Sequence, residues 1–153
     1  MIREKTSEDT TRISEIWLET SIRAHAFVPE SFWRADFKEM SEVLLPKARG
    51  LVHETDGVVD GFVTFGEGEI YCLFVDPESQ GNGIGSLLLR HVQSMFESIE
   101  LTVYEQNPRA QQFYERNGFV EVSVALCQYT GAPEVLMVWN QGESSPSPPD
   151  DKL

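Results

Sequence analysis

One short glycine-rich segment constrains this chain more than any other part of its sequence. Residues 80–86 read Gln-Gly-Asn-Gly-Ile-Gly-Ser; they follow the apolar stretch 69–75 and open an amphipathic stretch, 84–96. A strand, a glycine turn and a helix in this order bring several backbone N–H groups and the positive end of the helix dipole to one point. Because glycine has no Cβ, a phosphate can approach the backbone closely there. The segment therefore predicts a site for a phosphate-bearing ligand.

Two common nucleotide-binding patterns fit this segment poorly. The dinucleotide fingerprint G-x-G-x-x-G, counted from Gly81, requires glycine where Ser86 stands. The Walker loop G-x-x-x-x-G-K-[ST] requires a lysine, and residues 80–86 contain none. A nucleotide-dependent enzyme is therefore a weak interpretation of this segment.

The remaining pattern predicts one mixed α/β domain. Asp56-Gly57 between two apolar stretches indicates a hairpin with a type I′ turn, and a helix between two later strands indicates a parallel crossover. Apolar residues at helical spacing predict four helices, with Pro46 ending the second and Gly118 the last. The second helix is expected to bury one stripe: Phe32, Trp33, Phe37, Met40 and Leu44. Strands are expected at 2–5, 51–55, 58–65, 69–75, 101–104, 120–129 and 134–139.

Length and composition bound the domain and its partners. The 153 residues suit a single domain at 1–141, followed by a Ser/Pro-rich acidic tail at 142–153 that is expected to be disordered. With 25 acidic against 12 basic residues, the net charge of −13 argues against nucleic acid and is compatible with a cationic acceptor such as an amine.

Cysteine and histidine usage favours the cytoplasm and gives no metal site. Cys72 and Cys127 lie in apolar stretches, as reduced core cysteines do. No stretch approaches the roughly 20 apolar residues that span a bilayer, so no membrane association is expected. Three histidines and two cysteines never reach metal-ligand spacing, so no metal is expected.

Two motifs resemble the GNAT superfamily of N-acetyltransferases, in particular its small stand-alone bacterial members. Residues 73–85 match the strand, then [QR]-x-x-G-x-[GA], then helix of its acetyl-CoA motif. Residues 107–119 match N-x-x-A-x-x-[FL]-Y-x-x-x-G-F. The other elements follow in family order from residue 2 to 139, so only the tail lies outside the resemblance.

The resemblance implies a fold and a cofactor site. The fold is a mixed, mostly antiparallel seven-stranded sheet, splayed between its fourth and fifth strands (69–75 and 101–104) and flanked by about four helices. Pantetheine would lie in the split, and acetyl-CoA would be the co-substrate. The residues expected to bind it are Leu73, Phe74, Val75, Gln80, Gly81, Asn82, Gly83, Ile84, Gly85, Ser86, Asn107 and Tyr114.

The resemblance also implies a general acid but leaves the general base open. Tyr114 would stand near the cofactor sulfur and protonate it, since a tyrosine hydroxyl with a pKa near 10 is protonated at neutral pH. Many relatives carry a glutamate as base on one of the splayed strands, yet the fifth residue before Asn107 is Thr102. Candidate bases are His25, Glu69, Tyr71 and Glu105.

The expected function is transfer of the acetyl group of acetyl-CoA directly to a primary amine of a small molecule, peptide or protein. Cys72 has no evident base partner, which favours direct attack over an acetylated cysteine. The alternative is a CoA-binding sensor or partner module without catalysis, which the missing glutamate at Thr102 would permit. A homodimer is possible, because dimers are common in the superfamily.

Overall fold

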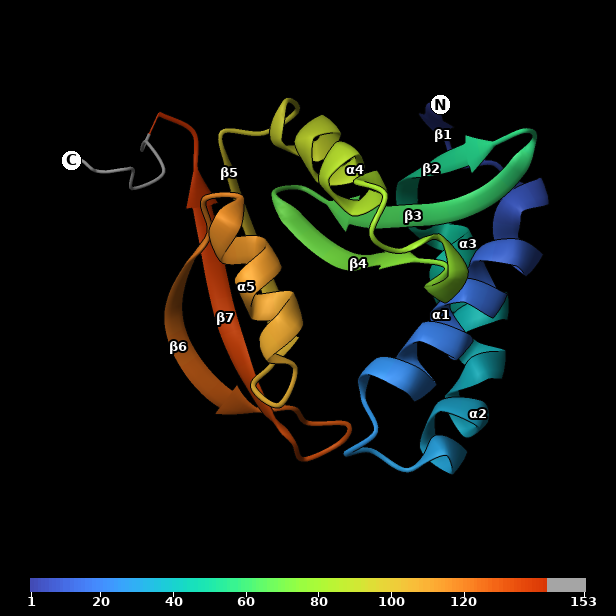
Figure 1. Cartoon of the computed structure of the whole chain (residues 1–153). Helices are drawn as coiled ribbons and strands as arrows, with labels where there is room; N and C mark the ends of the chain where they lie inside the picture. The colour runs from blue at the N-terminus through green and yellow to red at the C-terminus, as the bar shows by residue number, and fades with distance from the viewer. Residues whose placement is uncertain (143–153) are drawn as a thin grey trace.

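The computed structural model describes residues 1–142, so the predicted tail lies outside the described residues except for Gly142. Figure 1 shows a split sheet with helices on both faces. The strands are β1 Ile2–Glu4, β2 Arg49–Thr55, β3 Val58–Gly66, β4 Glu69–Val75, β5 Ser98–Tyr104, β6 Val120–Leu126 and β7 Pro133–Asn140. The main helices are α1 Thr10–Ala24, α2 Glu30–Glu39, α4 Ile84–Gln93 and α5 Pro108–Arg116, with a short α3 at Leu45–Lys47.

The sheet has seven strands in the order β1-β2-β3-β4-β5-β7-β6. All neighbours are antiparallel except β4 and β5, which are parallel and are joined through α4. The expected mixed, mostly antiparallel seven-stranded sheet is confirmed. No helix among residues 1–142 is long and apolar enough to cross a membrane.

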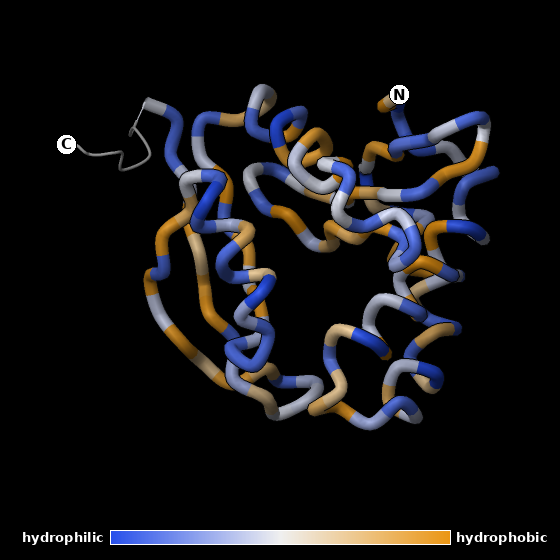
Figure 2. The backbone as a smooth tube through the Cα atoms, viewed as in Figure 1, coloured by the Kyte–Doolittle hydropathy of each residue, from blue (hydrophilic) through white to orange (hydrophobic). Residues whose placement is uncertain are grey.

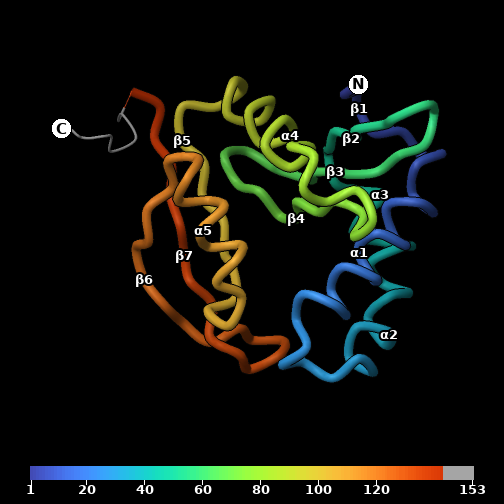
Figure 3. Tube along the Cα trace, viewed as in Figure 1, coloured from blue at the N-terminus to red at the C-terminus, as the bar shows by residue number. Residues whose placement is uncertain are grey.

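The sheet is split between β4 and β5. These strands pair only at Glu69 and Glu100, where the Glu100 N–H donates to the Gly68 carbonyl at 2.8 Å. Beyond this point they diverge, so β1–β4 and β5–β7–β6 form the two arms of a V that opens toward the carboxyl ends of β4 and β5 (Figure 3). The expected splay at this place in the sheet is confirmed.

Each face of the sheet has its own hydrophobic core. Helices α4 and α5 cover a cluster that includes Leu88, Leu89 and Ile99, and α1 and α2 cover a cluster that includes Ile13, Trp33 and Phe62. Hydrophobic and hydrophilic residues alternate along the helices in Figure 2, as expected for helices with one buried side. One pair of helices thus packs on each face of the split sheet.

The predicted hairpin turn is confirmed, whereas the end of the second helix differs from expectation. Asp56 and Gly57 adopt φ values of 52° and 81°, as a type I′ turn requires. After α2 the chain makes a π-helical turn over Met40–Leu44 and continues helically to Lys47, so Pro46 does not end the helix. A π turn holds one extra residue, which moves the buried position from Leu44, 48% exposed, to Leu45, 1% exposed.

Other boundaries also differ from the sequence pattern. Strand β6 ends at Leu126 rather than at residue 129, because Cys127 begins the turn to β7, in which the Gly131 N–H donates to the Cys127 carbonyl. Helix α4 ends at Gln93 rather than Phe96, because the N–H of Met95 turns back to the Val92 carbonyl and the Ser94 hydroxyl donates to the His91 carbonyl. Strand β5 begins at Ser98 rather than Leu101, because its pairing with β7 extends from Ser98 to Tyr104. Local hydrogen bonds thus set the end of α4, and pairing with β7 sets the start of β5. Hydrophobic periodicity alone shows neither boundary.

Candidate active site

The glycine turn between β4 and α4 presents free backbone donors. Gly81 and Gly83 have φ values of 87° and 80°, a left-handed conformation that favours glycine. The Gln80 side-chain amide donates to the Val75 carbonyl at 3.1 Å, and the Asn82 side-chain amide donates to the Ser79 carbonyl at 3.0 Å. The Leu87 N–H makes the first helical bond, to Gly83, so the N–H groups of residues 84–86 have no acceptor within the helix.

These donors line a cavity of about 430 Å³, which we call the turn cavity. Its other walls are β4, α5 and, through Thr20 and Ala24, α1. Arg109 and Arg116 of α5 line it as well and give it positive charge in an otherwise acidic protein. Backbone donors at a helix start together with two guanidinium groups are suited to bind a diphosphate.

Strand β4 presents unpaired backbone toward the split. The Asp76 N–H donates to the Asp60 carbonyl, and by the alternation of an antiparallel ladder the main-chain groups of Phe74 and Cys72 also face β3. Those of Leu73 and Val75 then face the split. The Val75 carbonyl accepts from Gln80, and no partner for the main chain of Leu73 is found within residues 1–142. An extended ligand arm in the split can therefore pair with β4 as a strand would.

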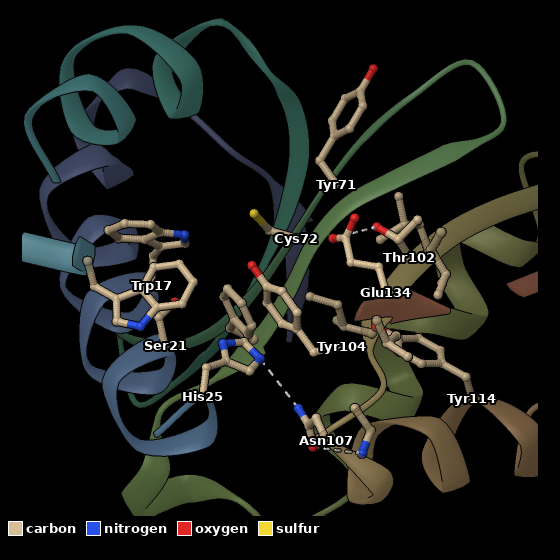
Figure 4. Close-up of a pocket in the computed structure, with 17 residues that line it drawn as sticks. Trp17, Ser21, His25, Tyr71, Cys72, Thr102, Tyr104, Asn107, Tyr114 and Glu134 are labelled. Carbon is tan, nitrogen blue, oxygen red and sulfur yellow. Dashed lines mark hydrogen bonds between the residues drawn. The ribbon is translucent and has the colours of Figure 1, made fainter. Parts of the chain in front are cut away.

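A second cavity, of about 230 Å³, lies on the α1–α2 side of the split; we call it the aromatic cavity (Figure 4). The rings of His25, Phe27, Trp33 and Tyr104 pack together at one end, with centroids 4.8 to 6.5 Å apart. The aromatic cavity is lined by side chains from α1, α2, β4, β5, α5 and β7. Its shape is therefore set by residues far apart in the sequence.

Three buried polar atoms of residues that line the aromatic cavity have no hydrogen-bond partner within residues 1–142: Ser21 Oγ, His25 Nδ1 and Trp33 Nε1. Buried polar atoms are normally satisfied, because each unsatisfied one costs free energy. These three atoms are enclosed within the wall of the aromatic cavity, where each unsatisfied group lowers the stability of the free protein.

Five residues line both cavities and so form a junction between them: Leu73, Phe74, Asn107, Ala110 and Tyr114. Asn107 is the N-cap of α5, and its Oδ1 accepts from the Ala110 N–H at 3.2 Å. Because a backbone N–H can only donate, the Asn107 Nδ2 is the atom that points to His25 Nε2, at 3.4 Å. The geometry of the helix cap thus holds the Asn107 amide at the junction.

Tyr114 is anchored at this junction by neighbouring rings. Its ring packs edge-on against Phe113 and Phe119, with centroids 5.1 and 5.5 Å away. Burial, with a smaller effect from Cys72, raises the pKa of the Tyr114 hydroxyl above its ordinary value. The hydroxyl is therefore protonated at neutral pH, in a residue that lines both cavities.

His25 lines the aromatic cavity in its neutral form. Burial lowers the pKa of its imidazole to about 4. Since Asn107 donates to Nε2, the proton of the neutral ring is on Nδ1. The lone pair of His25 is thus already directed at Asn107, which leaves it poorly placed to accept a proton from a substrate.

The other candidate bases lie less favourably. Glu69 is exposed at the closed end of the split and lines neither cavity, nor does the exposed Glu105. Tyr71 lines the aromatic cavity but is 56% exposed, and its hydroxyl points away from the other labelled side chains (Figure 4). For Cys72, burial raises the pKa of the thiol to about 11, which keeps it from acting as a thiolate nucleophile.

The structure adds cavity-lining residues that the sequence reasoning missed. Glu134 of β7 lines the aromatic cavity next to Thr102, whose hydroxyl donates to its Oε2 at 3.5 Å. Arg109, which lies inside the second motif, could have been found from its place beside the Asn107 cap. Glu134 could not, because it enters the site through the pairing of β7 with β5. No group of three His, Cys, Asp or Glu side chains within residues 1–142 is placed to hold a metal ion.

Comparisons with known proteins agree with this geometry. Residues 17–140 match the family model described as Acetyltransferase (GNAT) domain. The chain is 34% identical over 140 residues to the peptidyl-lysine N-acetyltransferase YiaC of Escherichia coli, covering 91% of this chain and 96% of that protein. It is 31% identical to the peptidyl-lysine N-acetyltransferase YjaB of the same organism, covering 89% of this chain and 92% of that protein.

Solved structures share the fold. The solution structure of apo YjaB from Escherichia coli superposes with a TM-score of 0.78 at 24% identity, covering 92% of this chain and 97% of that one. A PaiA N-acetyltransferase from Thermoplasma acidophilum in complex with coenzyme A superposes with a TM-score of 0.77 at 20% identity, covering 92% and 98% of the two chains.

Proposed function

The chain belongs to the GNAT acetyltransferase family and is an N-acetyltransferase, and from this premise we propose that it acetylates lysine side chains of peptides or proteins with acetyl-CoA. The observation that carries the proposal is the pair of cavities that meet at Tyr114, one lined by phosphate-binding donors and one open to an acceptor. The names of the curated relatives, peptidyl-lysine N-acetyltransferases, support lysine as the acceptor.

The turn cavity fits acetyl-CoA. Its diphosphate would accept from the N–H groups of residues 81–86, with Arg109 and Arg116 adding positive charge. The pantetheine arm would pair with the main chain of Leu73 and Val75 in the split, while Phe74 and Asn107 would line its path. A fold neighbour solved with coenzyme A supports this choice of ligand.

Acetyl-CoA supplies an activated thioester, and the residues of this chain would place it and manage protons. The split-facing N–H groups of β4 would polarise the thioester carbonyl. Tyr114 would protonate the leaving sulfur, since its hydroxyl is protonated and lines both cavities. The acceptor amine would enter through the aromatic cavity, and the neutral thiol of Cys72 favours direct transfer.

We also propose that the protein works in the cytoplasm. Both cysteines are free, with Cys127 buried and Cys72 partly buried, which suits a reducing compartment.

The test is release of the CoA thiol from acetyl-CoA in the presence of amines. The panel is Nα-acetyl-lysine methylamide, pentylamine and a peptide whose only amine is its N-terminus. We expect the highest kcat/KM with the lysine derivative. Turnover of pentylamine alone would point to a small-molecule acceptor, and CoA binding by calorimetry without turnover of any amine would favour a sensor.

A further inference from the structure

In the described part of the chain, the aromatic cavity contains a single carboxylate, and it comes from β7, a strand where the sequence predicted no site residue. Among the described residues that line either cavity, Glu134 is the only Asp or Glu. It pairs opposite Tyr104 in the β5–β7 ladder, and Thr102 is its diagonal neighbour on the same face. In Figure 4 its carboxylate lies beside Thr102 and faces Cys72 of β4 across the split. The sequence position expected to hold the base is therefore occupied by a hydroxyl that contacts an acid on the next strand.

The surroundings of Glu134 leave its charge uncompensated. No Lys, Arg or His lies within salt-bridge distance of it among residues 1–142. The titratable groups that share its cavity are His25 of α1, Tyr71 and Cys72 of β4, Tyr104 of β5 and Tyr114 of α5. His25 is neutral at physiological pH and Arg109 and Arg116 line the turn cavity instead. A partly buried carboxylate without a cation is a favourable place for an incoming ammonium group.

We propose that Glu134 binds the ammonium form of the acceptor and removes its proton, with Thr102 positioning the carboxylate. The inference rests on the proposed transfer to an amine. One N–H bond of the ammonium breaks and an O–H bond forms on Glu134. The free amine then forms the C–N bond as the C–S bond breaks. The sulfur takes its proton from Tyr114, Tyr114 regains one from the acetylated nitrogen, and Glu134 releases its proton to water.

The electrostatics of the site suit this role. Burial raises the pKa of the Glu134 carboxyl, and the hydrogen bond from Thr102 opposes the shift in part. A base with a raised pKa accepts a proton more readily near neutral pH. Because Tyr114 and Glu134 line the same cavity, a proton donor and a proton acceptor are placed around one acceptor site.

The test compares pH profiles of kcat/KM for Nα-acetyl-lysine methylamide, from pH 6 to 10, with acetyl-CoA saturating. For Glu134→Gln, which keeps the shape of the side chain, we expect a loss of about 100-fold at pH 7. The loss should shrink to less than about tenfold at pH 10, where much of the amine is already deprotonated. Relocating the carboxylate in Thr102→Glu/Glu134→Gln should recover at least about tenfold of the loss. Glu105→Gln, a strand-end glutamate outside both cavities, is the matched control and should stay within about twofold of wild type.

A binding measurement makes the inference independent of turnover. Calorimetry of the same lysine derivative with the CoA-loaded protein at pH 7 should show at least about tenfold weaker binding for Glu134→Gln, while CoA affinity stays within about twofold. If the wild-type protein turns over no amine, the proposed function is overturned, and the calorimetry still tests whether Glu134 binds the amine. Unchanged amine affinity, or a Glu134→Gln enzyme with wild-type activity and pH profile, would overturn the role of Glu134.

Discussion

The two cavities are built in different ways. The turn cavity is lined by one continuous glycine-rich segment with free backbone donors, together with Arg109 and Arg116 of α5. The aromatic cavity is lined by side chains from several separate elements. Backbone donors are insensitive to side-chain identity as long as the turn can form, so the first site depends on glycines. The second depends on individual side chains such as His25, Ser21 and Glu134. Substitutions in the glycine turn should therefore affect the first site, and substitutions of single side chains in the aromatic cavity should affect the second.

Tyr114 lines both cavities, and its replacement should have the largest effect. For Tyr114→Phe we expect kcat to fall by about 300-fold, because the leaving sulfur loses its proton donor while the ring packing is kept. CoA affinity by calorimetry should stay within about twofold. A Tyr114→Phe enzyme with full activity would show that the hydroxyl is not the acid.

His25 of the aromatic cavity should make the free energy of unfolding fall at acidic pH. With a folded-state pKa of about 4 against an ordinary value near 6.5, the imidazole is protonated more easily in the unfolded chain. Its contribution is complete above pH 6.5 and is lost as the pH falls toward 4, by up to about 3 kcal/mol of unfolding free energy. Urea unfolding at pH 7 and 4.5 measures it. His25→Gln should flatten the pH dependence, and His91→Gln, at an exposed site, should leave it unchanged.

CoA binding at the glycine turn should be sensitive to a residue that disfavours the left-handed backbone conformation, even when that residue adds no charge or polar group. A Cβ at Gly83 would meet nothing within 4 Å, so the main effect expected of Gly83→Val is on the backbone. Its φ of 80° disfavours valine by about 2 kcal/mol, and CoA affinity should fall by about 20-fold if the turn must keep this shape to bind. Gly131→Val, with φ of 77° and equal space in the β6–β7 loop, is the matched control. Equal loss of CoA affinity in both variants would contradict the role of the turn.

Two serines of α1 provide the smallest and most specific test of the aromatic cavity. Ser14 Oγ donates to the Thr10 carbonyl at 2.6 Å, whereas Ser21 Oγ is buried and has no hydrogen-bond partner in the described part of the chain. Ser21→Ala should raise the unfolding free energy of the ligand-free protein by about 1 kcal/mol, because it removes an unsatisfied buried hydroxyl. Ser14→Ala should give no such gain. A loss of stability in Ser21→Ala would show that the hydroxyl is satisfied in the free protein.

The same contrast explains what the sequence could reveal. The turn at 80–86 and the Asn107 cap were predictable because each is encoded by neighbouring residues with a strict backbone requirement. Likewise, Asp56-Gly57 identified the β2–β3 hairpin. The seven-stranded split sheet was expected only through the resemblance to a family, since pairing of β7 between β5 and β6 is not a local property.

The features that could not be predicted from the sequence depend on strand pairing and on one irregular helical turn. Glu134 and Thr102 are 32 residues apart and meet only because β5 and β7 pair as they do. The burial of Leu45 in place of Leu44 follows from one π turn that helical periodicity does not register. Glu69 and Glu105 were plausible bases on paper, but both strand ends place them outside the cavities.

Amide hydrogen exchange with and without CoA tests most directly whether the ligand lies along the glycine turn and in the split between β4 and β5. The account predicts slower exchange on CoA binding at Leu73, Val75 and residues 84–86, and no change at the tip of the β2–β3 hairpin near Gly57. Protection confined to other segments, with these amides exchanging as in the free protein, would contradict it.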